Sequence, residues 1–183
     1  MIRTLVSLTF VASLFSACSG PVETRVETRI NAPLSSPWDY RFSEKAGQSS
    51  DAYKKAQRLV DKALNAKGGT RAENGVFLVQ LALADRPASL TISAGEKEQK
   101  HVLSAAKEKE LLQSCDDSEH LFSISLLDQR TGTIVYRGDA LEYHCKGTLN
   151  GSLPHLVKAA LSQMGGAPMS SSKTSKLMRS GTD

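Results

Sequence analysis

The 183-residue chain has few aromatic residues, few cysteines and no long apolar run. Aromatic side chains make up 5% of the residues, so a core has to be assembled chiefly from Leu, Val, Ile and Ala. Three cysteines are too few for a small scaffold held together by many disulfides. No apolar run reaches the roughly 20 residues of a membrane-spanning helix, which excludes a multi-span membrane protein. With 40% hydrophobic and 23% charged residues, the composition predicts one folded domain and excludes a mostly disordered chain.

The sequence also lacks the motifs of common enzymes. It has neither type of glycine-rich phosphate-binding loop and no CxxC pair of metal ligands. Ser170-Ser-Ser-Lys173 matches the SxxK pattern of penicillin-interacting enzymes, but the companion motifs are missing, so the match is fortuitous. The four histidines are scattered, as surface histidines are: His101, His120, His144 and His155. We therefore expect no catalytic residues, no cofactor and a non-enzymatic role.

The formal net charge of +4 gives little indication of a partner. Arg3 lies in a leader described below, and segment 169–183 holds three basic residues against one acidic residue, Asp183. Subtracting one charge for the leader and two for that segment from +4 leaves about +1 for the domain between them. A charge this small does not favour nucleic acid, and we expect no nucleic-acid partner.

The first eighteen residues are typical of a bacterial lipoprotein leader. Arg3 precedes an apolar stretch of about eleven residues, which is too short to span a membrane and suits a secretory signal. Leu14-Phe15-Ser16-Ala17-Cys18 resembles the lipobox, in which a peptidase cuts before a cysteine that carries diacylglycerol and a further acyl chain. Phe15 stands where Leu is commoner. We expect a signal peptide at 1–17 and a lipid tether at 18–21, anchored in the membrane through Cys18. The alternative is an ordinary signal peptide with a chance cysteine.

Alternating apolar and polar residues predict strands in several places. Residues 22–30 place Val, Thr or Ile at every second position with Glu or Arg between them. Trp38, Tyr40 and Phe42 alternate in a short strand that closes the core. Segments 121–128 and 133–144 predict a hairpin, with Gly132 in the turn. The nearly continuous apolar segment 76–84 predicts a central strand covered on both faces.

Helical spacing predicts two main helices. One covers 51–67, with Ser49, Ser50 or Asp51 as its cap. The other begins at Gly151, with Ser152 as cap and Pro154 in its first turn. Strong helix formers favour a peripheral helical insertion within 86–119, although Leu90 and Ile92 could instead extend a strand. The Ser-, Lys- and Thr-rich segment 169–183 predicts a disordered basic tail. The fold class is thus a single α+β domain over 22–168, a mainly antiparallel sheet with two principal helices packed on it.

Two readings are open for the cysteines that remain after Cys18. In an oxidising compartment Cys115 and Cys145 could form a disulfide, closing a loop that contributes roughly 3.5 kcal/mol on the chain-entropy view. A metal site could instead use Cys115, His120, His144 and Cys145. Consecutive residues of a strand point to opposite faces, which weakens a site that uses both His144 and Cys145. We favour the disulfide and expect no metal.

The order of these elements resembles the domain-of-unknown-function 4136 family of bacterial envelope lipoproteins, over about 22–165. The resemblance is carried by Asp128, the Thr131-Gly132 turn and the run Tyr136-Arg137-Gly138-Asp139-Ala140. Tyr136 stands where the family more often has Trp, and Asp139 interrupts the run. The resemblance implies a small α+β lipoprotein domain and supplies no catalytic residues.

Three functions follow as hypotheses. The first is a non-enzymatic lipoprotein on the periplasmic face of the outer membrane of a Gram-negative bacterium, a location that Ser19 after the lipidated cysteine favours by analogy. There it would have a structural role or contact an envelope protein. The second is a binding module for a small apolar or glycan ligand near Trp38 and Tyr40. The third, an envelope hydrolase, lacks a recognisable site.

Overall fold

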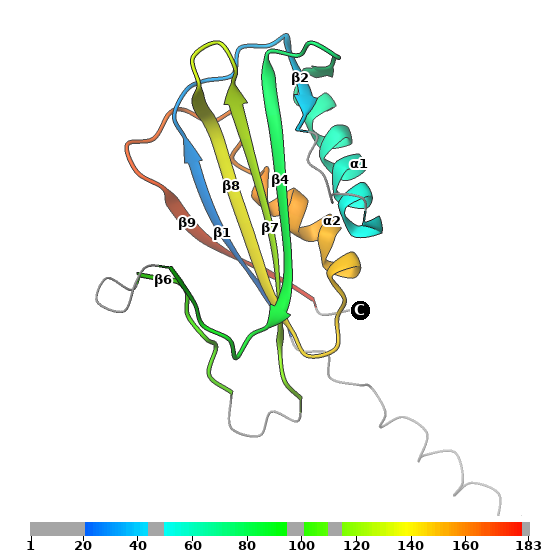
Figure 1. The fold of residues 1–183 in the computed structure, drawn as a ribbon, viewed down its shortest axis with the longest axis vertical. Helices are drawn as coiled ribbons and strands as arrows, with labels where there is room; N and C mark the ends of the chain where they lie inside the picture. Colours follow the sequence, from blue (N-terminus) through cyan, green and yellow to red (C-terminus); the bar gives the residue numbers. More distant parts are fainter. Residues whose placement is uncertain (1–20, 44–49, 95–100, 110–114, 181–183) are drawn as a thin grey trace, which may run out of the picture.

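A computed structural model describes residues 21–43, 50–94, 101–109 and 115–180 (Figure 1). The lipobox with Cys18 lies outside these residues. The described part is a single α+β domain in which two helices pack on a seven-stranded, mostly antiparallel open sheet. The predicted fold class is therefore confirmed. None of the helices in the described ranges is long and apolar enough to cross a membrane.

The strands of the main sheet follow the order β3-β2-β4-β7-β8-β1-β9. Only the β2–β3 and β2–β4 pairings are parallel. In chain order the main sheet consists of β1 (Val22–Ile30), β2 (Trp38–Phe42), β3 (Gly69–Arg71), β4 (Phe77–Pro87), β7 (Ser118–Asp128), β8 (Thr133–His144) and β9 (Lys173–Arg179). The helices are α1 (Asp51–Asn65) and α2 (Leu149–Ala160), and both lie on the same face of the sheet (Figure 1).

The predicted alternation of β1 is confirmed. Thr24, Val26, Thr28 and Ile30 are buried on the face that carries the helices, and the charged residues between them lie on the opposite face, the outer face. The predicted hairpin is confirmed as β7 and β8, whose turn uses the left-handed backbone of Gly132 (φ +69°). β7 begins three residues earlier than the pattern suggested.

Helix α1 agrees closely with its prediction. The Ser50 side chain accepts a hydrogen bond from the backbone N of Tyr53 at 3.2 Å, which caps the helix. One stripe of α1 is buried against the sheet: Tyr53, Ala56, Val60 and Leu64. The helix ends two residues before the predicted position 67, and Gly68 follows with φ +82°.

Helix α2 begins one turn earlier than predicted. Its N-cap is Thr148, whose side chain accepts from the backbone N of Gly151 at 3.1 Å, so Ser152 is not the cap but a buried residue inside the helix. Pro154 therefore lies beyond the first turn and cannot donate to the carbonyl of Asn150. Lys55 of α1 supplies the missing donor, with its Nζ 2.7 Å from that oxygen.

Three further predictions are wrong in the described residues. β4 lies within the sheet, but its outer face is not fully covered, because Ala82 is exposed. The insertion at 86–119 is not helical where it is described: the two short strands β5 (Ile92–Ala94) and β6 (His101–Ser104) pair antiparallel. The segment predicted as a disordered tail contains β9, which pairs with β1 along seven residues.

Gly138 allows helix α2 to approach the sheet closely. A side chain at this position of β8 would overlap the backbone carbonyl of Ala160, at the end of α2. The hydroxyl of the buried Tyr136 donates a hydrogen bond to the same carbonyl. Gly138, the glycine of the aromatic-Arg-Gly run, is thus required for the close packing of α2 on β8.

We expect Gly138→Ala to lower the free energy of unfolding by about 1–3 kcal/mol, because the added methyl group forces the sheet and α2 apart. The measurement is urea denaturation followed by circular dichroism. Gly151→Ala is the matched control: the added methyl would make only ordinary contact with Thr148, so this variant is expected to be no less stable than the wild type. Equal losses in the two variants would contradict the packing role.

Candidate functional site

Two features of the described residues could carry function. The first is a buried polar cluster at one end of the core, which consists of Thr24, His120, Glu142, His144, Ser152 and Arg179. The second is the Tyr143 pocket on the outer face, which is lined by Arg25, Ala105, Ala106, Lys107, Leu141 and Tyr143.

The strand register assembles the polar cluster. Glu142 of β8 lies opposite Thr24 of β1 on one side and opposite His120 of β7 on the other. His144 lies two residues further along β8 and so points to the same face. Ser152 reaches this face from α2, which packs above it. Five strand and helix positions that would otherwise be apolar are therefore polar at this end of the core.

Ser152 lies between the two histidines. Its Oγ is 2.8 Å from Nδ1 of His120 and 3.0 Å from Nε2 of His144, and the two rings stack with centroids 4.8 Å apart. The other ring nitrogen of His120 is 3.7 Å from a carboxylate oxygen of Asp85. The arrangement joins β4, β7, β8 and α2 through side chains alone.

The geometry does not support a serine nucleophile. In a catalytic triad the histidine uses one nitrogen for the serine and the other for the carboxylate. Here Nε2 of His144 faces both Ser152 and Oε2 of Glu142, the latter at 2.9 Å. His120 turns its two nitrogens to Ser152 and Asp85, but the 3.7 Å to the Asp85 carboxylate is too long for the hydrogen bond that orients a catalytic histidine. Ser152 is also only 1% exposed, so a substrate could reach its hydroxyl only if α2 moved away. The cluster is therefore a structural network.

Glu142 is the charged centre of this network. Its carboxylate accepts from Oγ1 of Thr24 at 2.5 Å, from His144 and from the guanidinium of Arg179 at 3.0 and 3.3 Å. Burial raises the pKa of Glu142, but the hydrogen bonds from His144, Arg179 and Thr24 outweigh burial and lower the pKa to about 2. Glu142 is thus ionised at neutral pH, and β9 supplies the cation that balances it.

Cys115 and Cys145 form a disulfide with their Cα atoms 5.7 Å apart, so the predicted pairing is present. The alternative metal site is not assembled, because His120 and His144 point into the polar cluster while both sulfurs are joined to each other. Asp117 lies near the two sulfurs, but disulfide sulfurs are not thiolates and are poor metal ligands. The disulfide fixes the end of the insertion to the end of β8.

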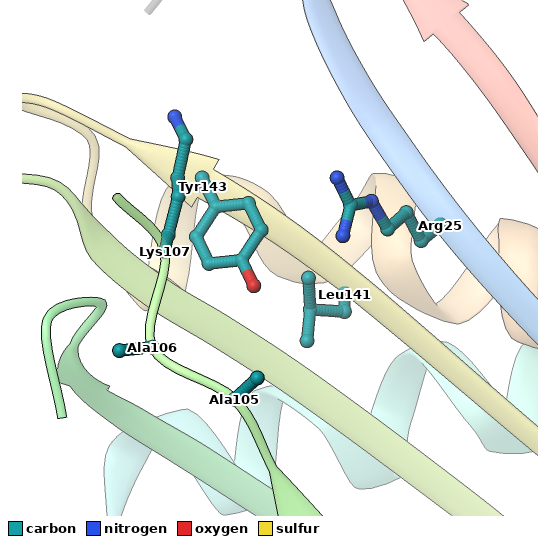
Figure 2. A pocket seen from close by; sticks show the side chains of 6 residues that line it. All are labelled: Arg25, Ala105, Ala106, Lys107, Leu141 and Tyr143. Atoms are coloured by element: carbon teal, nitrogen blue, oxygen red, sulfur yellow. The ribbon is translucent and has the colours of Figure 1, made fainter. Parts of the chain in front are cut away.

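The Tyr143 pocket has a volume of about 400 Å³ and lies between β1, β8 and the insertion. In Figure 2 the Tyr143 ring lies between Lys107 and Arg25, and Leu141 lies beside Arg25. The guanidinium of Arg25 and the Nζ of Lys107 are 5.6 and 5.2 Å from the ring centroid, within the range of cation–π contacts. Burial, and next the carboxylate of Glu119, raise the pKa of Tyr143, so its hydroxyl keeps its proton at neutral pH.

The ligand site predicted near Trp38 and Tyr40 is filled by the core. Tyr40 is completely buried, and its hydroxyl bonds to Asp61 of α1 at 2.9 Å. Trp38 is 7% exposed, packs edge-on against Phe77 and donates to the carbonyl of Lys67 at 3.4 Å. These aromatic residues therefore close the core, as the alternation of the strand indicated.

Sequence reasoning did not find the polar cluster or the Tyr143 pocket. A signal for the cluster is present, because Glu142 and His144 continue the period-two pattern that Tyr136 and Ala140 set on the core face of β8. We predicted that the four histidines lie on the surface. This is confirmed for His155, which is exposed, and is wrong for His120 and His144, which are buried. The side chain of His101 lies outside the described residues. Ser170, of the SxxK match, is exposed and belongs to neither feature.

No protein-family model and no curated protein matches this sequence. Solved structures with similarity to the chain include a PDZ domain protein from Parabacteroides distasonis, at 12% identity and a TM-score of 0.54. That match covers 86% of this chain but 39% of the other protein. The PelC dodecamer from Paraburkholderia phytofirmans and a point variant of it match at 13% and 14% identity, with TM-scores of 0.49 and 0.48. Each covers 78% of this chain and nearly all of PelC. At such identities the PDZ domain protein indicates a shared fold alone.

We expect Arg179→Gln to destabilise the domain by about 3 kcal/mol at pH 7, because it leaves the buried Glu142 carboxylate without its cation. The stability that comes from the lowered pKa of Glu142 is fully present above 4.5, its ordinary value, and is lost as the pH falls through about 2. The difference between variant and wild type should therefore be smaller at pH 3 than at pH 7.

Guanidinium denaturation at the two pH values measures this difference. Lys173→Gln, at the other end of β9, is the matched control, because Lys173 is exposed and its substitution should change stability by less than about 0.5 kcal/mol. A loss in Arg179→Gln that is the same at both pH values would contradict the role assigned to Glu142.

Proposed function

We propose that this chain is a lipid-anchored protein of the periplasmic face of the outer membrane and that it acts by contacting an envelope protein, without catalysis. The observation that carries the contacting role is the edge of the sheet formed by β9. One edge of β9 pairs with β1, and it is the last strand of the sheet in the described residues. Two adjacent apolar side chains on it, Leu177 and Met178, are 44% and 62% exposed. Such edges are templates for binding another strand.

Two observations support the location. The disulfide between Cys115 and Cys145 is of the kind that persists outside the reducing cytoplasm. The lipobox-like run that ends at Cys18 precedes β1 by only a few residues. The resemblance to the 4136 family of envelope lipoproteins points in the same direction and stays a prediction.

The buried polar cluster supports a non-enzymatic role, since Ser152 is inaccessible, His144 uses one nitrogen for both of its partners, and His120 lies 3.7 Å from the Asp85 carboxylate. A second function, binding of a small ligand, is favoured by the Tyr143 pocket and is taken up below.

We expect Cys18→Ser to abolish incorporation of radiolabelled palmitate and to release the protein from the membrane fraction. A single thiol carries the lipid on this proposal, so the double variant Cys115→Ser/Cys145→Ser should still incorporate the label. Label that persists in Cys18→Ser would overturn the proposed anchor.

We expect a photo-crosslinking amino acid at position 178 to give a defined product with one envelope protein in living cells. The same amino acid at Lys54, which is exposed on α1, is the control and should give no such product. Replacing the exposed apolar side chain of Leu177 by a charged one, through Leu177→Lys, should weaken the product from position 178. Products that are alike at the two positions, or that are insensitive to Leu177→Lys, would contradict a docking role for β9.

A further inference from the structure

The Tyr143 pocket is assembled from three separate parts of the chain. Arg25 comes from β1, Leu141 and Tyr143 from β8, and residues 105–107 from the insertion that lies over the outer face (Figure 2). The pocket is thus separate from the polar cluster and from the β9 edge residues. Its volume of about 400 Å³ lies within the range of small-molecule sites.

The insertion is held firmly where it forms the pocket wall. The backbone N of Lys107 donates to the carbonyl of Ala88 at 2.8 Å, and the backbone N of Ala88 donates to the carbonyl of Asp117 at 2.8 Å. The Nζ of Lys107 pairs with the carboxylate of Asp117 at 2.5 Å. The disulfide at Cys115 then ties this segment to the end of β8. A wall fixed in this way loses little freedom when a ligand binds.

The charge around Arg25 favours an anion. The carboxylate of Glu23 is shared by two cations, Arg25 at 2.8 Å and Lys176 of β9 at 3.1 Å. One carboxylate cannot neutralise both, so Glu23, Arg25 and Lys176 together carry one net positive charge beside the pocket. Arg25 is half-exposed and can receive a further oxygen ligand through its planar guanidinium.

The remaining lining restricts what the anion can be attached to. Leu141, Ala105 and Ala106 offer a small apolar wall. The Tyr143 hydroxyl already bonds to the Glu119 carboxylate, and its oxygen can still accept a hydrogen bond from a ligand hydroxyl group. The pocket is about half open to solvent, so an alkyl chain in it would stay largely exposed. Because Arg25 and Lys107 flank the Tyr143 ring, a nucleobase has no clear face on which to stack. A sugar acid has an anionic group, hydroxyl groups and an apolar ring face, and so matches each part of the lining.

We propose that the Tyr143 pocket binds an acidic saccharide, with its carboxylate or phosphate group on Arg25, a hydroxyl group at Tyr143 and its apolar face against Leu141. The inference does not depend on the lipid anchor or on a protein partner at β9. The saccharide could be part of a soluble glycan or the headgroup of a glycolipid.

The test is isothermal titration calorimetry of the full chain in detergent micelles with trigalacturonate, and with neutral maltotriose as the comparison ligand. We expect trigalacturonate to bind and maltotriose to bind at least tenfold more weakly.

Arg25→Gln should weaken trigalacturonate binding by about tenfold or more, since a charge-assisted contact is lost. Tyr143→Phe should give a smaller loss of a few-fold. Arg29→Gln is the matched control, because Arg29 is exposed on the same strand and face outside the pocket and should bind within twofold of the wild type.

Equal binding of the two saccharides, no binding of trigalacturonate at millimolar concentration, or equal losses in the Arg25 and Arg29 variants would overturn the proposal. Vesicles that carry a glucuronosyl lipid distinguish the two sources. Displacement of trigalacturonate by these vesicles, with the same dependence on Arg25, supports a glycolipid headgroup. Failure of the vesicles to compete supports a soluble glycan. Binding to vesicles that is indifferent to Arg25→Gln, with no binding of the trisaccharide, would refute the site.

Discussion

The ion pair between Glu142 and Arg179 is the interaction on which this end of the domain depends. A carboxylate without exposure in the core is costly unless its charge is balanced and its lone pairs are filled. Thr24, His144 and Arg179 meet that requirement from β1, β8 and β9. Because β9 supplies the only guanidinium on this carboxylate among the described residues, the last strand is linked to the core and is more than a cover for the edge of β1.

The disulfide has a comparable role on the outer face. On this face β1 presents alternating Glu and Arg residues, and β8 presents Leu141 and Tyr143 beside them. The segment that ends at Cys115 is held over this surface by Ala88, Asp117 and the bond to Cys145, and the hollow beside Tyr143 is the result. The two faces of the sheet thus differ: the helices and the aromatic core cover one, and the other carries the hollow beside Tyr143.

The sequence predicted those elements whose pattern is local. β1, α1 and the β7–β8 hairpin carry their own periodicity, caps and turn residues, and the structure follows them. β9 has no such pattern, and it becomes a strand because β1 offers a free edge and Arg179 reaches Glu142, neither of which can be read from residues 169–183. The insertion contains good helix formers, yet its described part pairs as β5 and β6, so the pairing of these two short segments outweighs helix propensity there. Ser152 is of a residue type that often caps helices, but Thr148 caps α2 one turn earlier.

The Tyr143 pocket combines residues from three segments that are distant in the sequence, and no rule based on residue spacing would bring them together.

The register of β1 sets how far these features can lie from the bilayer. Val22 pairs with Arg179 and Thr24 with Glu142, so the start of β1, the end of β9, the polar cluster and the disulfide share one end of the sheet. If Cys18 carries the lipid as proposed, β1 begins four positions after the anchor, and a fully extended chain spans at most about 14 Å over those four steps. Arg25 is seven residues from Cys18 and can be no more than about 25 Å from it. The pocket would then lie close to the lipid headgroups. The short tether would give it a high effective concentration toward groups displayed on the membrane surface.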